Sequence, residues 1–271
     1  MALHIEKFGD VTRLRMSSPG SRAAGLHVSA YVIRGIMVDT GFHRVRRELL
    51  EAIDRERVQA AVVTHWHEDH AGNAALLAAR GLPLFVRPDT EATLRARPSI
   101  QLYRRVVWGY ARRLATPVAK FPGEMLQFLH TPGHSADHQV VWDPETGTLF
   151  SGDLWLGVRS SVLHASEDPY AIVESLRTVE RLDPARMFDA HRGLVESPAR
   201  AIRAKIDWML ETLHTVEDQV VAGRGDREIV RTVLGGEEMA AVVSRGDYAR
   251  RNLVKAVRAR LSSRAGAARP G

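Results

Sequence analysis

Six consecutive positions, from His65 to His70, hold three histidines, a glutamate and an aspartate. Buried polar groups at the end of a strand need partners, and a metal ion can satisfy several of them together. If these side chains bind metal, the missing ligands must come from other parts of the chain, held within about 2.0–2.2 Å of one ion. The cluster therefore constrains the fold, because separate strands have to bring further histidines and carboxylates to the same place.

Further candidate ligands follow other predicted strands, each at the point where the strand ends. A short buried strand is predicted just before His65, and strands are also predicted before His134, Asp153 and His191. Because loops at one edge of a sheet lie together, we expect these side chains to converge. The donors are enough for two ions with a bridging carboxylate; they are His65, His67, Asp69, His70, His134, Asp153 and His191.

The sequence resembles the metallo-β-lactamase-fold hydrolases. The motif HWHEDH matches their His-x-His-x-Asp-His signature, TPGH supplies a fourth histidine, SGD an aspartate and DAHRG the last histidine, while YVIRGIMVDTG resembles their opening strand pair. The resemblance spans roughly residues 28–196 and implies an α/β fold, a four-layer αββα sandwich. It also implies two metal sites. His65, His67 and His134 would hold one ion, Asp69, His70 and His191 the other, and Asp153 would bridge them.

The same resemblance implies a reaction in which a metal-bound hydroxide attacks the substrate. Two ions that share a water lower its pKa toward neutrality, and Asp69 is implied as the group that accepts the proton. The chain has no cysteine, so all ligands offer nitrogen or oxygen, which suits zinc and leaves manganese or iron as alternatives. We expect a small acyl substrate, meaning a thioester, lactone or ester. The alternatives are an endoribonuclease acting on single-stranded RNA and an iron-dependent oxygenase.

Patterning divides the chain into a catalytic domain, residues 1–196, and a wholly helical C-terminal extension, residues 197–271, whose last ten residues have the composition of a disordered tail. An arginine-rich helical insertion is predicted at about residues 89–121. Its aromatic and arginine side chains suit a lid over the metal centre that binds an acyl chain and an anion. They equally suit stacking on single-stranded bases, or a plain amphipathic helix that covers the sheet.

Some other side chains are weaker candidates for contacts with substrate. These are His138, Arg159, His164 and, in the insertion, Tyr103 and Trp108. For His138 the alternative is a hydrogen-bonded residue that starts a strand, and for Arg159 and His164 it is a solvated loop. Glu68, which lies between candidate ligands, is expected to be exposed or locally hydrogen-bonded.

The formal net charge of +6 raises the question of a nucleic-acid partner. Lysine occurs at only four positions and arginine supplies the rest of the 38 basic residues, which favours a compositional bias over a binding surface. Neither a secretory signal nor a membrane-spanning segment is apparent, so the cytoplasm is the predicted location. The basic C-terminal segment YARRNLVKAVRARL suits packing in the first place, with a homodimer or nucleic-acid binding as the alternatives.

Overall fold

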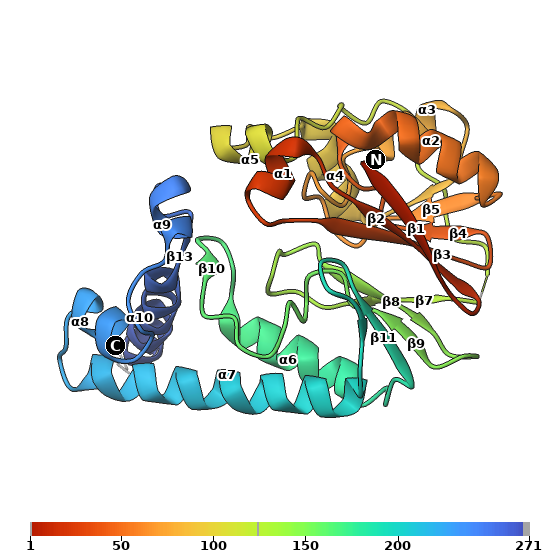
Figure 1. The fold of residues 1–271 in the computed structure, drawn as a ribbon. Helices are drawn as coiled ribbons and strands as arrows, with labels where there is room; N and C mark the ends of the chain where they lie inside the picture. The colour runs from red at the N-terminus through yellow and green to blue at the C-terminus, as the bar shows by residue number, and fades with distance from the viewer. Residues whose placement is uncertain (1, 124, 268–271) are drawn as a thin grey trace.

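Two β-sheets lie face to face at the centre of the computed structural model, which describes residues 2–123 and 125–267 (Figure 1). The first sheet has its strands in chain order: β1 (Leu3–Phe8), β2 (Val11–Met16), β3 (Val28–Ile33), β4 (Ile36–Val38), β5 (Ala60–Val62) and β6 (Leu84–Phe85). Neighbours from β1 to β4 are antiparallel, whereas β4, β5 and β6 are parallel. The carboxyl ends of β4, β5 and β6 therefore share one edge of the sheet.

The second sheet has the order β12-β11-β9-β8-β7. Its strands are β7 (Gln127–His130), β8 (Gln139–Asp143), β9 (Thr148–Phe150), β11 (Arg186–Asp189) and β12 (Gly193–Val195). β9 and β11 are parallel, and the chain between them includes α6 (Pro169–Glu180). Asp168 caps α6, because its carboxylate accepts hydrogen bonds from the backbone N–H groups of Tyr170 and Ala171.

Aromatic side chains fill the space between the two sheets. The ring of Tyr31 lies 5.4 Å from that of Phe150 and 5.2 Å from that of Phe188. The Tyr31 hydroxyl donates to the backbone carbonyl of Asp189 at 2.6 Å and so links the first sheet to the second. Every residue of β3 is buried, since both faces of this strand are covered.

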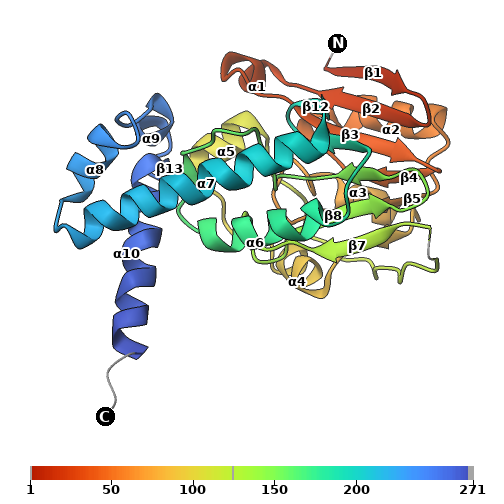
Figure 2. The ribbon, with the colours of Figure 1, turned by 90° about the horizontal axis from the view of Figure 1, so that it is seen from below.

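Helices cover the two outer faces and complete four layers (Figure 1). The helices before β7 are α1 (Pro19–Ala23), the short 3₁₀ helix His43–Val45, α2 (Arg46–Arg55), α3 (Ala74–Ala79), α4 (Pro88–Ala96) and α5 (Leu102–Val107). On the other side α6 and the long α7 (Pro198–Val221) lie along the second sheet (Figure 2). The αββα sandwich expected from the sequence is thus confirmed.

The C-terminal part contains α8 (Asp226–Thr232), α9 (Met239–Val243), β13 (Tyr248–Ala249) and α10 (Arg250–Ala267). Its helices share one apolar core with the second sheet, in which Leu176 of α6 and Met187 of β11 belong to the same cluster as Ile206 and Val254. The division at residues 196 and 197 stays a prediction, but this shared core attaches the extension firmly.

Two predicted segments differ from the structure. Within residues 89–121 the helices end at Ala96, just before Pro98, and at Val107, and the chain beyond is irregular while Trp108 and Leu114 enter the core of the first sheet. Proline disfavours helix at the preceding residue, and burial of these apolar side chains compensates for the lost backbone bonds. The extension is not wholly helical, because β13 interrupts it. Residues 262–267, expected to be disordered, continue α10, and residues 268–271 lie outside the described part.

Among the described residues, no helix is long and apolar enough to cross a membrane.

Candidate metal centre

The candidate ligands come from both sheets and meet at one edge of the sandwich. His65, His67, Asp69 and His70 occupy the loop between β5 and α3 of the first sheet. The second sheet supplies the others from the ends of its strands: His134 after β7, Asp153 after β9 and His191 after β11. The structure therefore brings together all seven side chains that the sequence predicts.

The ligand atoms form two groups, each with its atoms within 4.8 Å of one another. The first group comprises His65, His67, His134 and Asp153, and the second comprises Asp69, His70 and His191. Figure 1 shows why this is feasible, because the ends of β5, β9 and β11 face the same side of the molecule. This division is the one that the family resemblance implies.

Asp153 lies between the groups, with one carboxylate oxygen directed to each. Its Oδ2 is 3.3 Å from Nε2 of His134, whereas its Oδ1 is 3.2 Å from Nε2 of His70 and 3.3 Å from Nε2 of His191. Four ligands placed tetrahedrally about 2.0–2.2 Å from an ion are about 3.3–3.6 Å apart. The spacing around Asp153 therefore fits two metal sites that share this carboxylate.

The distances between the other ligand atoms are slightly shorter or longer than the spacing expected for tetrahedral ligands. Nδ1 of His67 is 2.9 Å from Nε2 of His65 and 3.0 Å from Nε2 of His134. Oδ2 of Asp69 stands 3.7 Å from Nε2 of His191 and 3.8 Å from Nε2 of His70. Asp69 is thus the least closely engaged member of its group.

Two buried atoms at the centre have no hydrogen-bond partner among the described residues, Nε2 of His70 and Oδ1 of Asp153. They are only 3.2 Å apart, yet their geometry is not that of a hydrogen bond. Buried polar atoms are nearly always paired. An imidazole nitrogen and a carboxylate oxygen each offer a lone pair to a cation, and both atoms belong to the groups of potential ligand atoms, so the residues fit a metal ion.

At three ligands, His65, His67 and Asp153, electrostatics favour the ionisation state that metal binding needs. At His70, His134 and His191 burial acts to lower the pKa, but the neighbouring carboxylates outweigh it and raise the pKa. Burial lowers the pKa of His65 and of His67 well below the ordinary value, so both rings are neutral. Burial alone would raise the pKa of Asp153, but the neighbouring His70 and His191 outweigh it and hold that pKa well below its usual range. Neutral imidazoles and an ionised carboxylate are the forms that bind metal.

The match to a known family decides the identity of the fold. The family model of the metallo-beta-lactamase superfamily matches residues 23–191, which is more than half of the chain. The chain belongs to the metallo-beta-lactamase superfamily. With the full set of candidate ligands in place, it is a metal-dependent hydrolase of that superfamily.

Relatives in other organisms are similar over much of the chain. "Beta-lactamase-like protein 2 homolog" of Caenorhabditis elegans is 25% identical over 253 residues, covering 88% of this chain and 76% of the relative. "Atrochrysone carboxyl ACP thioesterase" of Aspergillus fumigatus is 28% identical over 182 residues, which is 64% of this chain and 51% of the thioesterase. This chain therefore spans about half the length of that relative.

Solved structures of metallo-beta-lactamases share the fold. A crystal structure of VMB-1 has a TM-score of 0.62 at 20% identity and covers 77% of this chain and 97% of its own. A crystal structure of the DIM-1 metallo-beta-lactamase has a TM-score of 0.61 at 17% identity, with coverage of 78% and 98%. At these identities the likeness shows the architecture alone.

Two carboxylates that the sequence analysis missed contact histidines of the cluster. Oδ2 of Asp39 is hydrogen-bonded to Nδ1 of His70 at 2.8 Å, so that Nε2 of this ring is directed to the cluster. Oε1 of Glu167 is 2.8 Å from Nδ1 of His134, without the geometry of a hydrogen bond. Asp39 follows the predicted strand before Thr40 and could have been found there. Glu167 has no signal in the sequence.

His138 holds the backbone of Asp153. Its Nε2 accepts a hydrogen bond from the backbone N–H of Asp153 at 3.1 Å, and its Nδ1 donates to the carbonyl of Thr131 at 3.1 Å. Burial lowers the pKa of His138 to about 3, so the ring is neutral. It precedes β8, as the structural alternative held, and its contact with Asp153 connects it to the metal cluster.

The other weaker candidates lie at different distances from the cluster. Trp108 is buried, with its ring 6.4 Å from that of His191, while Arg159 is exposed. His164 has its ring 6.5 Å from that of His67, and the Tyr103 hydroxyl donates to Asp247 at 2.7 Å. Contact of these side chains with substrate stays a prediction.

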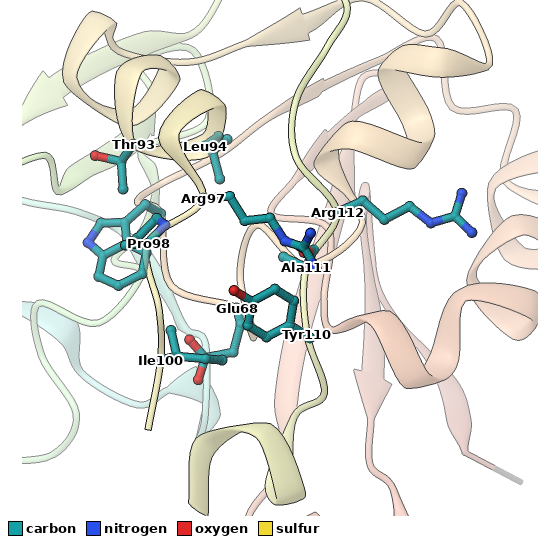
Figure 3. A pocket seen from close by; sticks show the side chains of 10 residues that line it. Glu68, Thr93, Leu94, Arg97, Pro98, Ile100, Tyr110, Ala111 and Arg112 are labelled. Carbon is teal, nitrogen blue, oxygen red and sulfur yellow. The ribbon is translucent and has the colours of Figure 1, made fainter. Parts of the chain in front are cut away.

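Glu68 is buried, so the expectation of an exposed side chain is wrong. Arg104 of α5 donates to both of its carboxylate oxygens, at 2.7 and 2.6 Å. Beside Glu68, Arg97 lies over the ring of Tyr110 at 4.1 Å and helps to line a pocket (Figure 3). With about 30 Å³ of space this pocket holds a water molecule but no acyl chain.

Proposed function

We propose that the protein hydrolyses a small acyl compound, a thioester in the first place, at a centre of two zinc ions. The observation that carries the dinuclear part is the Asp153 carboxylate, which directs one oxygen to His134 and the other to His70 and His191. Nitrogen and oxygen ligands in this number suit zinc, with manganese and iron as the alternatives.

The ions, when bound, would lower the pKa of a shared water and polarise the substrate carbonyl. His65, His67 and His134 would hold one ion, His70, His191 and Asp69 the other. Asp69 is 7% exposed and stands farther from its neighbouring imidazoles than Asp153 does. That looser engagement leaves a carboxylate oxygen free to hold the attacking water and accept its proton, which supports Asp69 as the general base.

The thioester preference is supported by the names of relatives. Besides the Aspergillus fumigatus protein, "Thioesterase pkgB" of Emericella nidulans is 30% identical over 135 residues, 49% of this chain. These names describe those proteins, and both matches cover only part of them. They make a thioester the first substrate class to test here, before lactones and simple esters.

The endoribonuclease alternative ranks second, because several of the insertion's arginines already have partners. Arg104 is bound by Glu68, Arg95 by Glu91, and Arg113 donates to the backbone carbonyl of Arg95. An arginine that is held in this way contributes little to phosphate binding. The predicted RNA contacts therefore lose part of their basis.

The test is turnover of a panel of acyl-coenzyme A thioesters and homoserine lactones by zinc-loaded protein, with and without chelator. We expect chelator-sensitive release of thiol or ring opening for at least one member. A matched control is His214→Ala, which removes an exposed histidine of α7 and should leave turnover unchanged. Cleavage of single-stranded RNA without any acyl turnover would contradict the proposal, as would oxygen consumption by iron-containing protein.

Location and assembly stay predictions. We infer a cytoplasmic protein that acts on a small molecule without membrane binding, and a homodimer is the assembly to test, by light scattering.

A further inference from the structure

The C-terminal extension reaches back to the candidate metal centre. β13 pairs with β10 (Leu163–His164) in a separate two-stranded sheet, in which His164 faces Tyr248 (Figure 1). Oδ2 of Asp247 accepts the hydroxyl hydrogen of Tyr103 at 2.7 Å, and Oδ1 lies 3.2 Å from Nε2 of His164. Asp247 thereby ties the extension both to α5 and to the loop that follows Asp153.

Tyr248, the next residue, is fixed from several directions. Its backbone N–H donates to the Ser244 hydroxyl at 2.9 Å, and Nδ2 of Asn252 donates to the Asp247 carbonyl at 3.0 Å. Its ring lies 5.0 Å from that of His164 and 6.2 Å from that of Tyr103. This much support gives the side chain a single well-defined position.

The hydroxyl of Tyr248 is the exception, because it has no hydrogen-bond partner among the described residues. Tyr248 is half-buried and its hydroxyl is not one of the buried polar atoms that lack a partner, so it is accessible to solvent and to a ligand. The other phenol hydroxyls of this region are paired: that of Tyr103 is bound to Asp247, and that of Tyr170 donates to Glu217 at 2.6 Å. A side chain held so firmly with its polar end unpaired resembles a group prepared for a ligand.

Ring contacts connect Tyr248 to the metal cluster. Its ring lies 5.0 Å from that of His164, and the ring of His164 lies 6.5 Å from that of the candidate ligand His67. Burial raises the pKa of Tyr248 well above its ordinary value, so the phenol stays protonated and acts as a donor.

We propose that Tyr248 contacts the substrate and donates a hydrogen bond to the oxygen of its acyl group. The inference deepens the acyl-hydrolase function and rests on it for the identity of the substrate. It assigns to the extension a part in substrate binding, since the donor comes from β13 while the candidate ligands come from the sandwich. The acyl oxygen gains negative charge during attack, so the bond strengthens as the reaction proceeds.

The test compares Tyr248→Phe with wild type, both loaded with zinc. The ring contacts are retained and the lost hydroxyl has no protein partner, so the melting temperature should not change. Hexanoate, which is the carboxylate product of a hexanoyl thioester, serves as the probe, and its binding is measured by calorimetry. Hydrogen bonds to charged groups lead us to expect a Kd weaker by roughly tenfold or more. With an active thioester, kcat/KM should fall by a similar factor.

Tyr170→Phe is the matched control, because it removes a phenol hydroxyl that is bonded to Glu217 elsewhere on the surface of α6. It should bind hexanoate as wild type does. Equal binding by Tyr248→Phe and wild type, equal losses in both variants, or no binding by wild type would each overturn the assignment. Weaker hexanoate binding by Tyr248→Phe without thioester turnover by wild type would retain Tyr248 as a ligand contact and reject the proposed function.

Discussion

Replacing Arg104 by methionine should destabilise the protein by about 3–5 kcal/mol, as expected when one partner of a buried ion pair is removed. Glu68 and Arg104 are each 4% exposed, and the two hydrogen bonds between them measure 2.7 and 2.6 Å. Two unit charges about 4 Å apart attract each other by about 4 kcal/mol at an effective dielectric constant of 20. Burial acts to lower the pKa of Arg104, but the charge of Glu68 outweighs it and raises that pKa, so the guanidinium is charged. Burial also raises the pKa of Glu68, and Arg104 opposes this shift.

The double variant Glu68→Leu/Arg104→Met should recover most of the lost stability, because neither charge then remains buried alone. The assay is urea unfolding of metal-free protein, which separates this effect from metal binding by the loop around Glu68. Arg105→Met is the control, since this exposed neighbour on α5 should change stability by less than about 1 kcal/mol. A coupling energy below about 1 kcal/mol in the double-mutant cycle would refute the reasoning, because that is how an exposed pair behaves.

Four further predictions concern the cluster and its supports. Asp153→Ala should lose bound metal and turnover together, measured by metal analysis alongside activity; retained metal would contradict its bridging role. Asp69→Asn should lower kcat by roughly 10²–10⁴-fold while some metal remains, and an unchanged kcat would remove its role as base. His138→Ala should weaken zinc binding by roughly 10–100-fold in a chelator competition, since the N–H of Asp153 loses its acceptor. Burial lowers the pKa of Lys205 from 10.5 to about 8, so the unfolded chain binds the extra proton between these values. Stability should therefore rise with pH across that window, by roughly 3 kcal/mol, and Lys205→Met should lack this rise in pH-dependent unfolding.

The candidate ligands could be predicted from the sequence because each follows the end of a predicted strand, and the loops at one edge of a sheet lie together. Both β5 and β11 are short apolar runs that lead directly into His65 and His191, so the convergence could be inferred without knowing how the sheets pack. The αββα arrangement followed from the resemblance carried by those motifs. At these positions the local pattern of a strand followed by a polar residue agrees with the convergence of the side chains in the structure.

The features that the sequence did not reveal all depend on contacts between distant segments. Glu68 shows no local sign of its partner Arg104, which lies 36 positions away on α5. Glu167 reaches His134 from just before α6, and Asp247 contacts both Tyr103 of α5 and His164 of β10. In the insertion, burial of Trp108 and Leu114 overrode the helical pattern. Such pairings are decided by tertiary packing, which periodicity within one segment does not encode.

The pairing of β13 with β10 separates two roles along the sequence, metal binding and the proposed substrate contact. Each candidate ligand lies before residue 192, whereas the Asp247 contacts and Tyr248 come from the last thirty residues and from α5. Variation confined to residues 244–249 would change the side chains beside His164 and leave the segments that carry the candidate ligands unaltered. A laboratory library restricted to these residues would therefore explore new substrates at constant metal content. Deletion of the whole extension would instead remove part of the apolar core that it shares with the second sheet.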